Sequence, residues 1–205
     1  METPIADVAD TAFWIAEMRA RESARPDALF SDPLAARLAG ERGAVIAQSI
    51  PWNDYVAWSV ALRTVIIDDF VRQSVATGTD TVLNLGAGLD TRPYRLDLPT
   101  NLRWIEADQA AVLAYKESRL REERSVCALE RWSVDLADGV QRRELLDRAA
   151  AGSRRTLVLT EGVVPYLENS AVSDLADELR ERRVIQGWIL DFISPLERFH
   201  FFSVA

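Results

Sequence analysis

Histidine and cysteine are nearly absent from this chain of 205 residues, which has one of each, His200 and Cys127. A single cysteine forms no intramolecular disulfide, and the two residues together are too few for the usual cysteine- and histidine-rich zinc sites. A lone histidine also removes most catalytic triads, and one so close to a chain end is more typical of a surface residue. The sequence therefore disfavours disulfide, zinc and triad chemistry.

The sequence also has no excess of positive charge and no long apolar run. The formal net charge is −8, so nucleic acid and anionic lipid would be repelled, whereas a small cationic ligand would not. No apolar run approaches the roughly 18 residues that span a membrane. The amino terminus has Glu2, Asp7 and Asp10 in place of the basic and apolar segments of an export signal. We therefore expect a cytoplasmic protein that binds neither nucleic acid nor membrane.

Helical and strand patterns alternate through most of the chain. Apolar residues at positions 55, 58, 62, 65, 66 and 70 predict a helix from Asn53 to Val75, with Asn53 or Asp54 as its cap and Gly78 just beyond its end. The later pattern predicts strands at 81–85, 104–108, 130–134, 156–160 and 187–193, and helices at 110–122, 138–151 and 170–183. With right-handed crossovers, this order gives a mostly parallel sheet with helices on both faces, the Rossmann-like α/β class.

About fifty residues precede this α/β core. Residues 11–40 are predicted to be mostly helical, interrupted by prolines at positions 26 and 33, with a third proline at position 51. A minimal nucleoside-binding sheet does not need such a segment, so we interpret residues 1–52 as a helical lid and residues 53–205 as the core. The composition, 48% hydrophobic and 27% charged, is typical of one soluble domain.

A glycine turn, Gly86-Ala87-Gly88-Leu89-Asp90-Thr91-Arg92, follows the first predicted strand. Glycine allows a sharp turn and brings backbone groups close to a ligand. Asp108 ends the second strand, 20 positions after Gly88, where its carboxylate can accept hydrogen bonds from both ribose hydroxyls. Thr91 occupies the third glycine position of the dinucleotide fingerprint, which disfavours the pyrophosphate of NAD. The pattern predicts a nucleoside ligand without phosphates, and the alternative on this motif alone is a turn with no ligand.

Glu161 directly follows the predicted strand at 156–160. A carboxylate next to buried residues is costly unless it has a partner, so we expect Glu161 in the binding crevice outside the carboxyl ends of the strands. Three other polar residues have an ordinary structural role as an alternative. Asp108 would cap the following helix, Asp135 would be a loop aspartate, and Arg63 would be a solvated helix residue.

Several segments together carry a family resemblance: 20–39 (ARESARPDALFSDPLAARLA), 62–70 (LRTVIIDDF), 82–96 (VLNLGAGLDTRPYRL), 104–109 (WIEADQ), 134–136 (VDL) and 160–167 (TEGVVPYL). They resemble the leucine carboxyl methyltransferase family, S-adenosylmethionine-dependent enzymes that include actinobacterial and polyketide-type carboxyl O-methyltransferases. The glycine turn and the Glu-Gly-x-x-x-Tyr-Leu segment are the most specific parts. The resemblance implies a Rossmann-like class I methyltransferase fold.

The resemblance also implies a cofactor site for S-adenosyl-L-methionine, with S-adenosyl-L-homocysteine as product. It assigns the cofactor carboxylate to Arg63, the methionyl part to Gly86, the ribose to Asp108, the adenine to Asp135 with the backbone of Leu136, and the ammonium group to Glu161. Three neighbouring residues, Ala87, Gly88 and Gln109, are also expected to contact the cofactor. Many methyltransferases begin the glycine motif with an acidic residue. Here that position is Asn84, a departure that this family often shows.

The implied reaction is in-line methyl transfer to the carboxylate of a small, polyketide-type metabolite. Such an acceptor is already ionised at neutral pH and needs no general base, so no catalytic residue is assigned. Tyr166 is a candidate for positioning the acceptor. Four aromatic residues before or within the first long helix would line an aromatic acceptor pocket or pack in the core: Trp14, Trp52, Tyr55 and Trp58.

The carboxyl end is shorter than the family pattern, which continues with a further helix and an antiparallel strand pair. We therefore expect an exposed sheet edge and an apolar face near Phe199, Phe201, Phe202 and Val204, which pairing with a second copy of the chain would cover. Two other functions stay open. One is a catalytically idle or partner-dependent S-adenosylmethionine-binding protein, and the other is an NAD(P)-dependent oxidoreductase.

Overall fold

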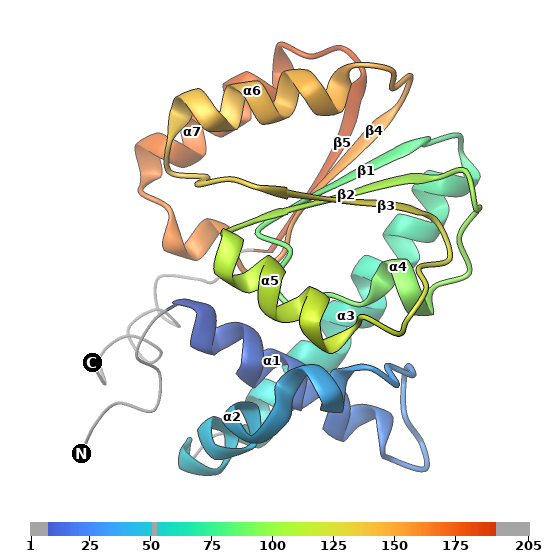
Figure 1. The fold of residues 1–205 in the computed structure, drawn as a ribbon, viewed down its shortest axis with the longest axis vertical. Coiled ribbons are helices and arrows are strands. Elements are labelled where there is room, and N and C mark those ends of the chain that lie inside the picture. The colour runs from blue at the N-terminus through green and yellow to red at the C-terminus, as the bar shows by residue number, and fades with distance from the viewer. Residues whose placement is uncertain (1–7, 51–52, 192–205) are drawn as a thin grey trace.

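Five parallel strands form one sheet within residues 8–50 and 53–191, the part of the chain that the computed structural model describes. They are β1 (Thr81–Leu85), β2 (Arg103–Asp108), β3 (Ala128–Ser133), β4 (Thr156–Thr160) and β5 (Ile185–Leu190). Their spatial order is β3-β2-β1-β4-β5 (Figure 1). The chain winds outward from β1 in one direction and then returns to β4 on its other side. This is the predicted doubly wound α/β sheet, whose ligands bind where the winding direction changes.

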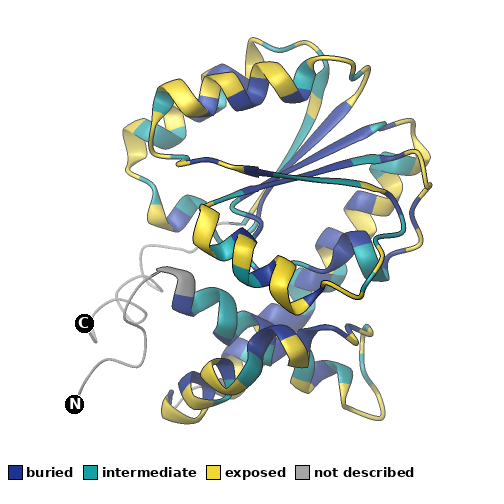
Figure 2. Ribbon diagram, viewed as in Figure 1, coloured by how far each residue is buried: buried dark blue, intermediate teal, exposed yellow. Residues whose placement is uncertain are grey.

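Helices cover both faces of this sheet (Figure 1). On one face lie α3 (Asn53–Ala76), α4 (Arg92–Arg95) and α5 (Ala110–Arg119), and on the other α6 (Gly139–Ala150) and α7 (Asn169–Arg180). Successive strand residues point to opposite faces. Val82 accordingly packs with Ile67 of α3, whereas Leu83 packs in a second cluster with residues of α6 and α7. Buried residues therefore run along the strands, with exposed residues on the outer helix faces (Figure 2).

Element boundaries differ from the sequence prediction by a few residues. β3 begins at Ala128 rather than at 130, because Ala128 pairs with Arg103 although its side chain is exposed. β5 spans 185–190, so it begins two residues before the predicted start at 187, and its pairing with β4 is irregular between Thr156 and Leu157. The last two residues of the predicted strand, 192–193, lie outside the described residues. Apolar patterns mark burial, whereas strand pairing continues into exposed positions.

Helix α3 shows a more instructive difference. The helix was predicted correctly, and Gly78 follows it with a φ of +102°. Its buried face, however, carries Val60, Thr64, Ile67, Asp68 and Val71, and not the apolar positions from which it was predicted. Most of those predicting positions are exposed, namely 55, 58, 66 and 70. Apolar residues lie on both sides of α3, so periodicity identified the helix but not the side that packs.

Two helices precede α3: α1 (Val8–Ser23) and α2 (Ala35–Ser49). The prediction of a mostly helical segment at 11–40 is right for these helices and wrong for residues 24–34, which are turns and irregular backbone. Pro26 and Pro33 lack the N–H that a helix interior needs. The helices cross closely, since a Cβ on Gly43 would lie 2.6 Å from the Phe13 carbonyl oxygen. The division into lid and core at residue 52 stays a prediction.

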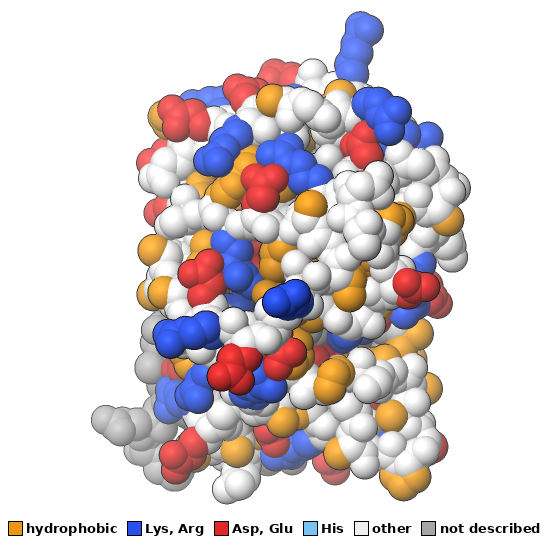
Figure 3. Space-filling view, turned by 45° about the vertical axis from the view of Figure 1, so that its right-hand side comes forward, with side chains coloured by type: hydrophobic (Ala, Val, Ile, Leu, Met, Phe, Trp, Pro, Cys, Tyr) orange, Lys and Arg blue, Asp and Glu red, His pale blue; other side chains and the backbone are white. Residues whose placement is uncertain are grey.

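Charged side chains of both signs are interspersed on the face drawn in Figure 3. Among the described helices, not one combines the length and apolar character that a membrane span requires.

Candidate functional site

Acidic residues stand at the ends of neighbouring strands. Asp108 ends β2, Asp135 lies two residues beyond β3, and Glu161 and Asp191 directly follow β4 and β5. Parallel strands end at the same edge of a sheet, so all of these carboxylates lie along one edge. The glycine turn after β1 separates Asp108 from Glu161 in this row.

The glycine turn has a geometry that requires glycine. Gly86 and Gly88 have φ values of +64° and +46°, in the left-handed region. The N–H groups of Gly86 and Ala87 donate to the Ala107 carbonyl at 2.8 and 3.3 Å, which fixes the turn on β2. A Cβ on Gly86 would lie only 2.4 Å from Val163 Cγ2. The turn therefore packs directly against the segment that follows Glu161.

Asp108 holds this turn from the next strand. Its Oδ2 accepts from the Gly88 N–H at 2.6 Å, and its Oδ1 accepts from the Gln109 N–H at 2.7 Å. The alternative role as a helix cap is wrong, because the N-cap position of α5 is Gln109. A carboxylate offers about four lone-pair sites, so accepting two backbone N–H groups leaves capacity for a diol.

At the end of β3, Asp135 is exposed and its Oδ1 accepts from the Ala137 N–H at 2.9 Å. The Leu136 carbonyl accepts from Arg142 Nη1 at 2.9 Å. The backbone group of Leu136 available to a ligand is therefore its N–H. Asp135 makes no contact with Arg63 or Glu161, so it lies in the same row of strand ends but apart from them.

Arg63 and Glu161 meet although 98 residues separate them. Arg63 extends from α3, and its Nε lies 2.9 Å from Glu161 Oε1, outside hydrogen-bond geometry. Its Nη1 donates to Asp191 Oδ2 at 2.7 Å. Among the buried side-chain nitrogens and oxygens of the described chain, only Arg63 Nε and Trp104 Nε1 lack a hydrogen bond. Arg63 is therefore not a solvated helix residue, and its Nε–H group has no hydrogen-bond acceptor.

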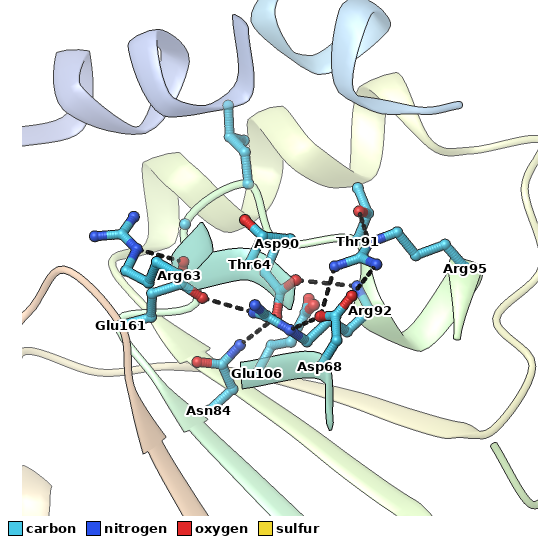
Figure 4. Close-up of polar contacts among 12 residues, drawn as sticks. Arg63, Thr64, Asp68, Asn84, Asp90, Thr91, Arg92, Arg95, Glu106 and Glu161 are labelled. Carbon is cyan, nitrogen blue, oxygen red and sulfur yellow. Dashed lines mark hydrogen bonds and ion pairs between the residues drawn. The ribbon is translucent and has the colours of Figure 1, made fainter. Parts of the chain in front are cut away.

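A second arginine, Arg92, holds Glu161 from the other side (Figure 4). Arg92 Nη1 donates to Glu161 Oε2 at 2.6 Å and lies 3.2 Å from Asp90 Oδ2. Arg92 Nε donates to Asp68 Oδ1 at 2.7 Å. Asp68 also accepts from both terminal nitrogens of Arg95, at 2.5 and 2.8 Å. Negative and positive side chains therefore alternate from Glu161 through Arg92 and Asp68 to Arg95.

These contacts set the charge of the acids. Burial works to raise the pKa of Glu161, but attraction to Arg92 and then to Arg63 outweighs it and lowers that pKa. Burial likewise opposes the charge of Asp90, yet Arg92, Lys116 and Arg95 lower its pKa to about 2. Asn84 donates to Asp90 Oδ2 at 2.8 Å. An acid in place of Asn84 would repel Asp90, which explains the amide at this position.

The leucine carboxyl methyltransferase family model matches residues 12–180. The chain belongs to this family. Relatives include a protein of Frankia alni, 38% identical over 184 residues, and one of Streptomyces coelicolor, 37% identical over 206 residues. These alignments cover 82% and 92% of this chain and 63% and 71% of the relatives. Each relative is named "Putative S-adenosyl-L-methionine-dependent methyltransferase".

A third relative of that name, from Streptomyces avermitilis, is 37% identical over 176 residues, which are 79% of this chain and 60% of that protein. The chain thus spans about 60 to 70% of the length of these curated relatives. A solved structure, an O-methyltransferase family protein from Burkholderia thailandensis, aligns with 11% identity and a TM-score of 0.42 over 93% of this chain and 54% of that one.

Sequence reasoning missed four residues of this family member's site: Asp68, Arg92, Arg95 and Asp191. Arg92 is the last residue of the glycine turn and Arg95 follows three positions later in α4, and nothing in the sequence indicates that either side chain is buried. Asp68 is four positions after Thr64 on the buried face of α3, but apolar residues on both sides of this helix hide that face in the sequence.

The aromatic and terminal predictions have mixed outcomes. Trp14 packs in an interior cluster with Met18 and Ile46, as its structural alternative predicted. Tyr55 and Trp58 are more than half exposed, so neither packs in the core. Tyr166 is 38% exposed and ends a short 3-10 helix, Val164–Tyr166, beside the Glu161 turn. Outside the described residues lie Trp52, His200 and the four apolar residues near the carboxyl end.

Proposed function

We propose that this chain binds S-adenosyl-L-methionine at the ends of β1, β2, β3 and β4, and that the protein transfers the methyl group to a carboxylate of a small organic acid. Family membership and the names of the relatives support the cofactor. The observation that carries the proposal is the meeting of Arg63 and Glu161 beside a glycine turn that Asp108 fixes in place.

The available groups fit this cofactor. Its amino-acid end carries one carboxylate and one ammonium group, which suit the unsatisfied Nε of Arg63 and the carboxylate of Glu161. Its ribose hydroxyls suit the remaining lone pairs of Asp108. Its adenine amine suits Asp135, and the adjacent Leu136 N–H can donate to a ring nitrogen. The cofactor also has a positive sulfonium and no phosphate, which matches a row of strand-end carboxylates.

When bound, S-adenosyl-L-methionine supplies a methyl group that its sulfonium sulfur makes electrophilic. The chain contributes orientation, because groups from α3, β2 and the β4 turn would hold the two ends of one ligand in place. A carboxylate acceptor is ionised at neutral pH, so no side chain has to remove its proton. The Tyr166 hydroxyl is the candidate donor that would position the acceptor carboxylate.

Calorimetric titration with S-adenosyl-L-methionine tests the cofactor, and mass spectrometry of a panel of carboxylic acids and phenols tests the acceptor. We expect saturable binding and methyl esters of at least one acid. Binding without transfer to any acid would contradict methyl transfer and favour a binding protein. Binding of NADH in place of S-adenosyl-L-methionine would contradict the proposal entirely.

A further inference from the structure

We propose that Asp68 of α3 is a positioning residue, which orients Glu161 toward the ammonium group of the ligand by holding Arg92. The inference rests on the proposed function, since it concerns the amino-acid end of the same cofactor. Asp68 itself does not reach the strand ends, where the ligand would lie, because Arg92 stands between it and Glu161.

Asp68 is a buried hub for two guanidinium groups. Its side chain is 1% exposed, and those of Arg92 and Arg95 are 3% and 4% exposed. Asp68 Oδ1 accepts from Arg92 Nε, and its two oxygens accept from the terminal nitrogens of Arg95. A buried carboxylate between two buried guanidinium groups fixes the planes of both, because charge-assisted hydrogen bonds are directional and water does not compete for them.

Arg92 transmits this orientation to Glu161. The guanidinium is planar, so anchoring its Nε on Asp68 also fixes the direction in which its Nη1 points. That nitrogen donates to Glu161 Oε2 at 2.6 Å. Glu161 Oε1 then points toward Arg63, the place that the proposed function assigns to the amino-acid end of the ligand. Without the anchor, Arg92 would be free to turn between Asp90 and Glu161, which already share its Nη1.

The same hub is tied to the amino-terminal segment. Arg95 Nε donates to Thr91 Oγ1 at 3.2 Å, and Thr91 Oγ1 donates to Asp32 Oδ2 at 2.7 Å. Asp32 also accepts from Arg19 of α1 at 2.9 Å. A continuous buried chain of polar contacts therefore runs from α1 through Asp68 to Glu161. Contacts to the helices α1 and α3 therefore support the position of the Glu161 carboxylate, which does not depend on its own loop alone.

Two ligands that differ only in the amino-acid end provide the test. S-adenosyl-L-homocysteine has this end, and 5′-methylthioadenosine has the same nucleoside and thioether without it. Calorimetry would compare the unmodified chain with D68N and with D69N, a matched control one residue away. Asp69 is 59% exposed and pairs with Arg72 at the surface.

For D68N we expect S-adenosyl-L-homocysteine to bind about tenfold more weakly, the order of one weakened charge-assisted hydrogen bond. Affinity for 5′-methylthioadenosine should change by less than about twofold, and D69N should leave both affinities unchanged. If Asp68 had a merely structural role, D68N would lower the affinity for both ligands equally. An equal loss for both ligands, or no loss for either, would overturn the proposal.

R95K provides a second variant if D68N does not fold, because it keeps the positive charge while it removes the paired contact with Asp68 and the Arg95 Nε contact with Thr91. We expect a smaller loss, about threefold, again confined to S-adenosyl-L-homocysteine. Equal effects on both ligands would refute the positioning role here as well. If the unmodified chain binds neither ligand, the proposed function fails and this role fails with it. If the unmodified chain binds both ligands and D68N binds each of them with unchanged affinity, only the positioning role fails.

Discussion

Replacing Gly86 by alanine perturbs the glycine turn in two separable ways. The backbone at this position has a φ of +64°, which costs an alanine about 1 to 2 kcal/mol. The new Cβ would also lie 2.4 Å from Val163 Cγ2, so the segment after Glu161 has to move. Overpacking of this kind adds about 1 to 3 kcal/mol. We therefore expect G86A to lower the free energy of unfolding by about 2 to 5 kcal/mol.

Gly152 provides the matched control for this variant. Its φ is +80°, but a Cβ there meets no heavy atom within 4 Å. G152A therefore carries only the backbone cost, about 1 to 2 kcal/mol. Equilibrium urea unfolding of both variants measures the difference, which we expect to be about 1 to 3 kcal/mol in favour of G152A. Equal destabilisation would refute the claim that the glycine turn packs directly on the Glu161 segment.

Three further predictions concern charge, capping and thiol reactivity. The folded-state pKa of Asp90 is lowered to about 2, so its contribution to stability is complete above about pH 4 and is lost as the pH falls toward 2; urea unfolding of D90N should lack this decline. Asp138 accepts from the Val140 and Gln141 N–H groups at the start of α6, and D138A should lower the melting temperature in calorimetry by about 2 to 4 °C without changing cofactor affinity. Burial raises the pKa of Cys127 to about 11, so at pH 8 the folded chain should react with a thiol reagent about a hundredfold more slowly than the urea-unfolded chain, and equal rates would contradict the burial.

Strand and helix patterns predicted the α/β sheet because burial imposes a period on the sequence. The run at 81–85 and the glycines that follow it needed no knowledge of distant contacts. Glu161 was also predictable as a partnered residue, since a carboxylate directly after a buried strand requires a partner.

The partners themselves were not predictable from sequence, because they come from distant segments. Asp68 and Asp69 are adjacent and chemically identical, yet one is buried between two arginines and the other is exposed. Only the packing side of α3 distinguishes them, and the apolar residues on both sides of that helix obscured it. Arg92 is recognisable in sequence as part of the glycine motif, whereas its contact with Glu161 depends on the β1–β4 pairing.

A crystal structure of this chain with S-adenosyl-L-homocysteine tests the central claim most directly. We predict that the ribose hydroxyls lie within hydrogen-bond distance of the Asp108 carboxylate and that the amino-acid end lies between Arg63 and Glu161. A ligand bound elsewhere, or one whose amino-acid end points away from these two residues, would contradict the account.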